Sequence, residues 1–307
     1  MEPASHQTYL THWYDENDFG RIIMRGKDAL SLLQRLSTND MLKIGEFQGN
    51  QTVLTTPIGR IIDLLHVVNC GDDVWVFTSV GQGPAVYRHL KQNIFFNDAV
   101  TLTPAARTHR QLAIYGSGAD ALVRDVFPAP SEARATTPRW HAFRSGEALV
   151  TRIQELGGGG WRIVWPVDQP LPDQLAALPQ LDDATLSIWQ VEAGVPAFGA
   201  ELSTEYIPLE AGLESAISFA KGCYVGQEII ARMESRGRRA KSLERVTLSQ
   251  LIDAPVEITN PAGQVMGVVT RAVRSPHHGP IALAYISSKA GDDTPLQAGG
   301  ATLIRGQ

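Results

Sequence analysis

Residues 51–80, QTVLTTPIGRIIDLLHVVNCGDDVWVFTSV, constrain the fold more than any other part of the sequence. Apolar segments of strand length are separated there by turn signals at residues 57–59 and 71–73. Strands that follow one another through such short turns pair antiparallel. The stretch therefore predicts an antiparallel meander.

Helical patterns lie on either side of this meander. The segment DALSLLQRLSTND repeats leucine at helical spacing, residues 84–93 have a helical pattern, and residues 182–194 begin with an aspartate cap and end at a glycine. The glycine run 157–160 lacks both the Lys-Ser/Thr ending and the following helix of a phosphate-binding loop. It therefore predicts the tip of a hairpin.

The pattern changes after Arg239. Short strand-like segments follow one another there, and turn signals at residues 260–263 and 276–279 separate them. A chain of 307 residues is long enough for two or three domains. The change predicts a separate small all-β domain from about residue 240.

Composition and cysteine content exclude several classes of protein. The formal net charge is −5, so general nucleic-acid binding driven by positive charge is not expected. Two cysteines without a CxxC spacing provide neither a disulfide framework nor a structural zinc site, and we predict no metal centre. The first 20 residues are polar and acidic, unlike a signal peptide, and no apolar run reaches the length of about 20 residues that crosses a membrane. We therefore predict a cytoplasmic protein.

Two acidic residues lie among apolar neighbours. Asp63 shares one face of a predicted strand with Ile61 and Leu65. Asp63 either lies near a strand end with access to water or is buried and needs hydrogen-bond donors. It is then either satisfied by backbone or an arginine, or directed into a ligand cavity. Glu192 follows Trp189 by three residues, in the last turn of a predicted helix, where the helix dipole disfavours an anion. It either forms a surface ion pair or faces a donor-rich ligand.

The segment KGCYVGQE, residues 221–228, places one of the two cysteines between a lysine and two glycines. If a helix begins near residues 224–226, the Cys223 thiol lies at its N-terminal end near Lys221, and both groups stabilise a thiolate. Free cysteines are otherwise usually buried and inert. A functional thiol and a structural one both remain open at this point.

The same segment resembles the signature of the YgfZ proteins, which are folate-binding members of the superfamily founded by the glycine-cleavage T-protein, an aminomethyltransferase. Further segments resemble that superfamily and occur in its order: LSTND, TPIGRIIDLL, EAGVPAFG, IPLEAGLESAISFA and GQVMGVVTRAVRSPHHGPIALAYI. The resemblance therefore runs almost end to end, and KGCYVGQE is its specific part.

The resemblance implies an α+β fold, with two intertwined mixed α/β lobes around a folate cavity and a C-terminal β-barrel. On this sequence the lobes would occupy residues 1–235 and the barrel domain residues 240–307. The implied ligand is tetrahydrofolate or a related folate.

The resemblance also implies roles for single residues. Asp63 matches the carboxylate that faces the reacting folate nitrogen in aminomethyltransferases, and Glu192 matches the acid that binds the pterin. An ionised carboxylate can accept side by side from the pterin's exocyclic amine and adjacent ring N–H. Lys221 lies in the region where the superfamily has a basic residue near the ligand, and Lys221 or Arg232 would meet the anionic glutamate tail.

Three functions are compatible with these residues. The first is a YgfZ-like protein that binds folate and supports the assembly or repair of iron–sulfur enzymes, its partners, through Cys223. The second is a tetrahydrofolate-dependent aminomethyltransferase that uses Asp63 and receives its one-carbon unit from a lipoyl carrier protein. The third is a folate-binding module without chemistry. Leu64 replaces the second acid of the transferases, whereas Asp63 itself is uncommon in YgfZ proteins, so an enzymatic role stays open.

Overall fold

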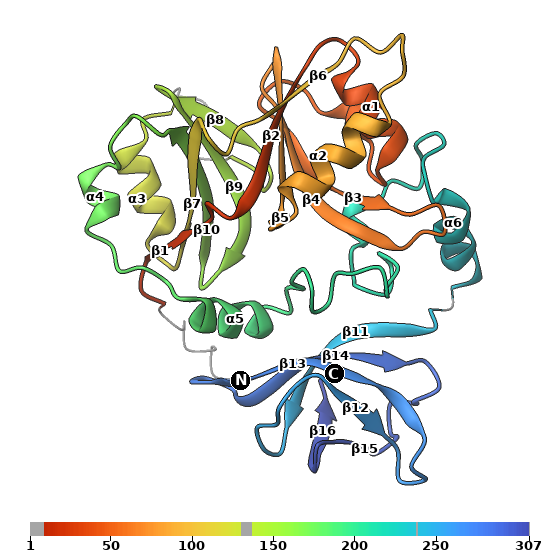
Figure 1. The fold of residues 1–307 in the computed structure, drawn as a ribbon. Coiled ribbons are helices and arrows are strands. Elements are labelled where there is room, and N and C mark those ends of the chain that lie inside the picture. Colours follow the sequence, from red (N-terminus) through yellow and green to blue (C-terminus); the bar gives the residue numbers. More distant parts are fainter. Residues whose placement is uncertain (1–8, 130–136, 238, 307) are drawn as a thin grey trace. The chain divides into compact units, whose positions relative to one another are not determined.

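A computed structural model describes residues 9–129, 137–237 and 239–306 (Figure 1). Residues 1–8, on which the signal-peptide argument partly rests, lie outside this description. The chain divides into two compact units. Unit 1 contains residues 1–35, 39–52 and 65–182, and unit 2 contains residues 36–38, 53–64 and 183–307. The units are interleaved along the sequence, because two short segments of the N-terminal half belong with the C-terminal part.

Two five-stranded sheets form the frame of unit 1. The first has the strand order β1 (His12–Asp15), β7 (His109–Tyr115), β10 (Gly159–Pro166), β9 (Ala148–Leu156) and β8 (Ala142–Ser145). The second has the order β3 (Gly49–Thr55), β4 (Ile61–Asn69), β5 (Asp73–Val80), β2 (Phe19–Arg25) and β6 (Thr101–Pro104). The ends of β3 and β4 next to their connecting turn belong to unit 2.

The predicted meander is confirmed, because β3, β4 and β5 are neighbours in the second sheet and β4 pairs antiparallel with β5. The predicted hairpin at residues 157–160 is confirmed as well. It joins β9 to β10, and Gly157 and Gly158 adopt φ values of 62° and 92° that side chains disfavour. Both features follow from local sequence patterns.

The two sheets of unit 1 face each other through an apolar cluster. Trp75 and Phe77 of β5 pack there with Leu149 of β9 and Val164 of β10. The opposite face of the first sheet is covered by α3 (Figure 1). The helices of this part are α1 (Ala29–Leu36), the short 3₁₀ helix η1 (Met41–Lys43), α2 (Gly83–Gln92), α3 (Ala119–Val126) and α4 (Asp173–Ala176).

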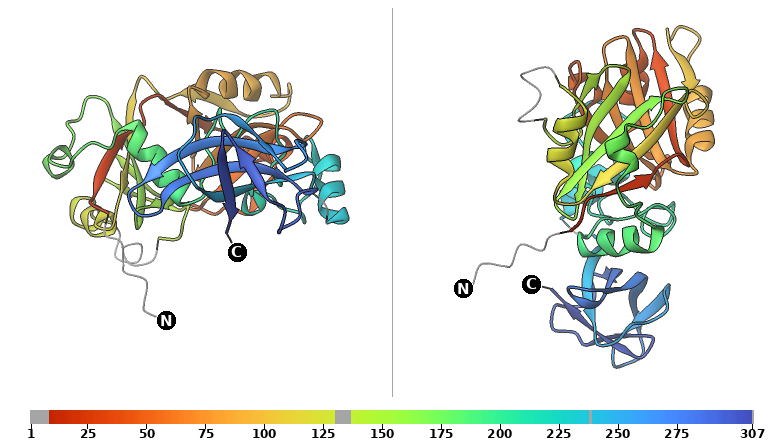
Figure 2. Two further views of the ribbon diagram at one scale, coloured as in Figure 1. Left: turned by 90° about the horizontal axis from the view of Figure 1, so that it is seen from below. Right: turned by 90° about the vertical axis from the view of Figure 1, so that its left-hand side faces the viewer.

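A closed barrel of six strands forms the C-terminal part of unit 2. Around the barrel the strands are β11 (Lys241–Leu248), β14 (Gly279–Ser287), β13 (Val265–Ser275), β12 (Val256–Thr259), β15 (Leu296–Ala298) and β16 (Ala301–Arg305). The strands of the barrel are drawn in blue in Figure 2. Its core includes Val246, Ile258 and Leu296. Closure removes the exposed sheet edges of the short strands that the sequence predicts for this region.

Unit 2 also contains α5 (Asp183–Glu192), the 3₁₀ helix η2 (Glu214–Ala216) and α6 (Gln227–Arg236). Val191 of α5 packs against Ile281 and Leu283 of β14, so this helix is fixed to the barrel. Buried Ile230 of α6 packs with Ile207 and Tyr224. The predicted α+β class with a C-terminal barrel is confirmed.

Candidate functional site

The five residues that the sequence singles out, Asp63, Glu192, Lys221, Cys223 and Arg232, all belong to unit 2. They lie on four different segments: β4, the end of α5, the loop between η2 and α6, and α6 itself.

Asp63 is fully buried on β4. Alternation along the strand explains this position, because Ile61 and Leu65 on the same face are also buried. Its Oδ1 accepts a hydrogen bond of 2.9 Å from the backbone N–H of Leu64. Backbone donation is one of the two alternatives that the sequence leaves open for this carboxylate, and it accounts for part of the stabilisation of the buried group.

Glu192 is the last residue of α5 and is half-buried. Its Oε1 accepts a hydrogen bond of 2.5 Å from the hydroxyl of Ser275 at the end of β13. That hydroxyl oxygen in turn accepts from the backbone N–H groups of His277 and His278, at 3.0 and 2.8 Å. The β13–β14 turn therefore fixes the position of the carboxylate. The sequence contains no signal for this serine beyond the turn itself.

Helix α6 begins at Gln227, and Gly226 is its N-cap with a φ of 84°. The sequence predicts that Cys223 lies near the N-terminal end of this helix if the helix begins near residues 224–226. The helix cap falls within that range, and Cys223 lies three residues before it. The left-handed conformation of Gly226 makes the transition from the loop to the first helical turn.

Lys221 is buried, with 8% of its surface exposed. Its Nζ donates a hydrogen bond of 2.6 Å to the carbonyl oxygen of Ser37 and lies 4.8 Å from the centre of the Tyr224 ring. The ammonium thus binds backbone and an aromatic face. This position anchors the loop to the segment after α1.

The Cys223 loop is also bound to the turn between β3 and β4. The Thr55 hydroxyl donates to the carbonyl of Val225 at 2.6 Å. A Cβ at Gly226 would lie 2.8 Å from Thr55 Oγ1, so only glycine permits this approach. The turn that leads into the Asp63 strand and the loop that carries Cys223 are therefore held together. Cys223 itself is exposed.

Arg232 is exposed on α6, as the sequence predicts for the arginines of this region. Ile230 on the same helix is fully buried.

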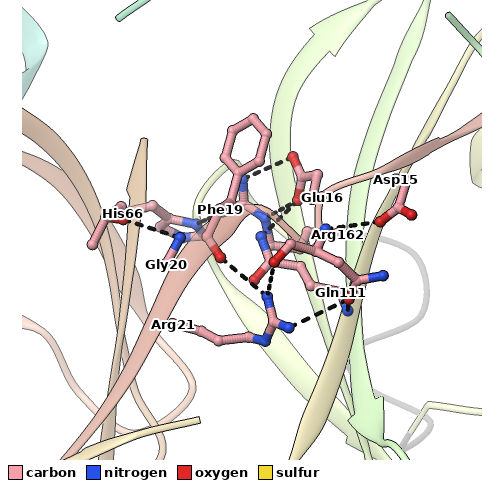
Figure 3. Close-up of polar contacts among 10 residues, drawn as sticks. Asp15, Glu16, Phe19, Gly20, Arg21, His66, Gln111 and Arg162 are labelled. Carbon is pink, nitrogen blue, oxygen red and sulfur yellow. Dashed lines mark hydrogen bonds and ion pairs between the residues drawn. The ribbon is translucent and has the colours of Figure 1, made fainter. Parts of the chain in front are cut away.

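A second polar centre, in unit 1, was not predicted from the sequence. Buried Glu16 pairs with Arg162 of β10, whose Nε and Nη2 donate to the carboxylate at 2.6 and 3.1 Å (Figure 3). Gln111 of β7 donates to the same carboxylate at 2.8 Å, and Arg162 Nη1 lies 3.3 Å from His66 Nδ1. The available signal was Arg162 itself, a charge within the apolar strand WRIVWP, which requires a buried partner.

These contacts define the protonation state of His66. Arginine can only donate and a carbonyl can only accept, so Nδ1 accepts from Arg162 while Nε2–H donates to the Trp140 carbonyl at 2.9 Å. Burial, with the charge of Arg162 in addition, lowers the pKa of His66 to about 3. The imidazole is therefore neutral at physiological pH.

The described part of the chain brings together no three His, Cys, Asp or Glu side chains that could hold a metal ion. None of the helices within residues 9–129, 137–237 and 239–306 has the length and apolar character that a membrane crossing requires.

Comparison with known families identifies the chain. The model of the GCVT N-terminal domain matches residues 11–221, which is more than half of the sequence. The chain belongs to the GCVT N-terminal domain family. The match ends at Lys221, so it covers Asp63 and Glu192 and stops two residues before Cys223.

Relatives of this GCVT-domain protein include the aminomethyltransferase of Thermoanaerobacter sp. strain X514, which is 26% identical over 295 residues covering 90% of this chain and 78% of the relative. The aminomethyltransferase of Rubrobacter xylanophilus is 28% identical over 301 residues, which cover 92% of this chain and 78% of the relative. A putative chloroplastic transferase of Arabidopsis thaliana is 27% identical over 232 residues and is covered to 52% of its length.

The crystal structure of the glycine cleavage system aminomethyltransferase T from Bartonella henselae has the same fold. It superimposes with a TM-score of 0.87 over 98% of this chain and 86% of that chain, at 18% sequence identity. The GCVT-domain protein thus has the glycine-cleavage T-protein fold that the resemblance implies.

Proposed function

We propose that this protein binds tetrahydrofolate and supports the assembly or repair of iron–sulfur enzymes in the manner of YgfZ proteins, with Cys223 as its functional thiol. The observation that carries the proposal is a difference between Cys223 and its neighbours in the KGCYVGQE loop. Lys221, Tyr224 and Gly226 are each engaged in holding the loop. Cys223 is exposed between them.

This difference supports a role for the Cys223 thiol other than packing in the core. A cysteine retained for packing usually lies against apolar side chains, as half-buried Cys70 does at the apolar cluster between the sheets of unit 1. Burial raises the pKa of the Cys70 thiol to about 12, which makes it inert. Cys223 differs in that a partner protein can reach it. A lone cysteine cannot ligate a cluster by the usual four thiolates, so any cluster contact would include ligands from the client.

Glu192 supports the folate part of the proposal. Each carboxylate oxygen has two lone pairs, so the hydrogen bond from Ser275 leaves the group able to accept from further donors. A pterin offers two adjacent N–H donors, and a carboxylate already fixed by Ser275 loses little conformational entropy when it binds them. Lys221, in contrast, is engaged with the Ser37 carbonyl, which leaves exposed Arg232 as the more accessible cation for a glutamate tail.

Folate binding is tested by thermal denaturation of the purified protein with and without saturating tetrahydrofolate. A rise in Tm with ligand concentration is expected. Glu192→Gln should weaken binding about tenfold or more, because its amide presents N–H donors to the N–H donors of the ligand. The exposed Glu205→Gln is the matched control and should bind as the parent does. No rise in Tm for the parent protein would remove the basis of the proposal.

The thiol is tested by complementation. In cells that lack this protein, the parent should restore the activity of a folate-sensitive iron–sulfur enzyme, whereas Cys223→Ser should not. Cys70→Ala is the control that removes the other cysteine. Equal restoration by Cys223→Ser would refute the role of the thiol.

A second candidate function is aminomethyl transfer to tetrahydrofolate, which the names of the curated relatives favour. In that case the buried carboxylate of Asp63 would orient the folate nitrogen or accept its proton. The surrounding protein would exclude water from the transferred group.

A one-carbon transfer assay separates the two candidates. It combines purified protein, tetrahydrofolate and an aminomethyl-loaded lipoyl carrier protein, and compares the parent with Asp63→Asn and Cys223→Ser. Asparagine keeps the acceptor for the Leu64 N–H and removes only the charge. Turnover that depends on Asp63 and ignores Cys223 would establish the transferase. Folate binding without turnover, and with no effect of either variant in cells, would establish a binding module without chemistry.

A further inference from the structure

Unit 1 contains a cavity that none of the candidate residues above lines. It measures about 750 Å³ and lies between the start of β2, the first turns of α2 and the end of β6. This volume falls within the range of small-molecule sites in proteins. The residues that line it are Asn17, Asp18, Phe19, Gly20, Arg21, Ile22, Gly81, Gly83, Pro84, Tyr87, Arg88, Lys91, Pro104 and Ala106.

Close backbone contact at two glycines shapes this cavity. A Cβ at Gly20 would lie 2.3 Å from Gly83 Cα, so α2 begins directly against the start of β2. The pairing of β2 with β5 shifts register between Phe19 and Arg21 at the same place. Such an irregularity changes the direction of the side chains around it.

Arg21 holds the walls in place. Its guanidinium donates to five acceptors, at distances from 2.9 to 3.3 Å: the backbone carbonyls of Asn17, Phe19, Ala106 and His109 and the side-chain oxygen of Asn17. Figure 3 shows Arg21 beside Phe19. Arg21 is buried, with 3% of its surface exposed. The cavity is therefore preformed, and its internal cation is already satisfied.

The chemistry of the lining is aromatic and apolar with two cations at the rim. Phe19 and Tyr87 provide aromatic surfaces, and the prolines and glycines of the lining add apolar surface without polar side chains. Arg88 and Lys91 lie one helical turn apart on α2 and are both exposed. Within the described residues neither forms an ion pair, and Asp18 is the only acid of the lining. Lys91 Nζ lies 5.9 Å from the Tyr87 ring centre, so charge and aromatic surface adjoin.

From this arrangement we propose that the cavity is a binding site for a small planar aromatic acid. The aromatic body would lie against Phe19 and Tyr87, and its carboxylate would meet Arg88 and Lys91. A neutral apolar ligand would leave both cations unused, and an aliphatic acid would lose the stacking. The proposal is independent of folate binding, because all lining residues belong to unit 1 and all candidate folate residues to unit 2.

Isothermal titration with naphthalene-2-carboxylate tests the proposal on the full chain. Naphthalene-2-methanol, which lacks the charge, and cyclohexanecarboxylate, which lacks the aromatic ring, should each bind at least about tenfold more weakly. Equal affinity for either comparison compound, or no binding of naphthalene-2-carboxylate at millimolar concentration, would overturn the proposal.

Variants of the lining residues test whether naphthalene-2-carboxylate binds in this cavity. Ala106→Trp fills the space from an exposed lining position and should abolish binding. Tyr87→Ala removes an aromatic wall and should weaken it, which provides a second test if the tryptophan variant does not fold. The double variant Arg88→Gln, Lys91→Gln should lose about tenfold in affinity. Arg124→Gln on α3, an exposed arginine of the same unit, is the matched control and should bind as the parent does.

A competition experiment separates this site from the folate site. Tetrahydrofolate should not displace naphthalene-2-carboxylate, and Glu192→Gln should leave its affinity unchanged. Displacement by tetrahydrofolate, or unchanged binding in Ala106→Trp, would show that the acid binds elsewhere. Failure of the folate test above would leave these results unaffected.

Discussion

Acidification should destabilise unit 1 through one buried imidazole. His66 is held in its neutral form, with Nε2–H donating to the Trp140 carbonyl and Nδ1 accepting from Arg162. A proton on Nδ1 would face the guanidinium of Arg162 at 3.3 Å in a site without water access. Burial and this charge lower the pKa of His66 from 6.5 to about 3.

The size and direction of the effect follow from linkage. Well above pH 6.5 both folded and unfolded chains carry a neutral His66, and the free energy of unfolding contains no contribution from its titration. Between pH 6.5 and about 3 the unfolded chain binds more protons, so the free energy of unfolding falls as the pH falls. For these two pKa values the loss is about 2.7 kcal/mol at pH 4.5, and below pH 3 it levels off at about 5 kcal/mol.

Urea denaturation at pH 7.0 and pH 4.5, followed by tryptophan fluorescence, measures this loss. Five of the six tryptophans report on unit 1: Trp13, Trp75, Trp140, Trp161 and Trp165. His66→Gln is the control, because its amide can donate to the carbonyl and accept from Arg162 but takes up no proton in this range. Carboxylates titrate in both proteins and cancel in the comparison. If parent and His66→Gln lost stability equally between the two pH values, the assignment of a neutral, proton-excluding His66 would be wrong.

Three further predictions concern particular residues. Maleimide at pH 8 should label exposed Cys223 much faster than half-buried Cys70 in the folded protein, as mass spectrometry of digests would show. Labelling of Cys70 at a similar rate would contradict the raised pKa of its thiol. Gly226→Ala should lower the free energy of unfolding, measured by urea titration, by about 1–3 kcal/mol, because φ is 84° and the added Cβ contacts the β3–β4 turn. Gly222→Ala is the control: its Cβ meets open space, so the free energy of unfolding should change little. Glu16→Gln should cost about 3–5 kcal/mol, because it leaves a buried arginine without its counter-charge, and a loss below about 1 kcal/mol would show that the pair is not desolvated.

The parts of the fold that the sequence predicts correctly are those with short-range patterns. The meander of β3, β4 and β5 is visible because alternation and two turn signals occur within residues 51–80. The glycines at residues 157–160 mark the β9–β10 hairpin for the same reason. Burial of Asp63 is one of the two positions that its apolar neighbours on the strand leave open, and the structure has it. In each case the information lies within a few residues of the feature.

The missed features depend on residues that are far apart in the sequence. Glu16 and Arg162 are separated by 146 positions, and only the pairing of β1, β7 and β10 brings them together. The same holds for Ser275, which lies 83 positions from Glu192. Periodicity can indicate that Arg162 needs a partner, but it cannot identify which acid provides it. Long-range sheet topology decides this, and a single sequence carries no direct record of it.

The KGCYVGQE loop shows how structural and functional constraints can be separated within one motif. Lys221 and Gly226 each satisfy a steric or hydrogen-bonding requirement of the loop, so their replacement would disturb Cys223 even if they had no contact with a ligand. Loss of activity in a Lys221 variant would therefore be no evidence for a folate contact. Cys223→Ser changes an exposed side chain and leaves those contacts in place. For this reason the cysteine, rather than the lysine beside it, is the position at which a loss of function can be attributed to chemistry.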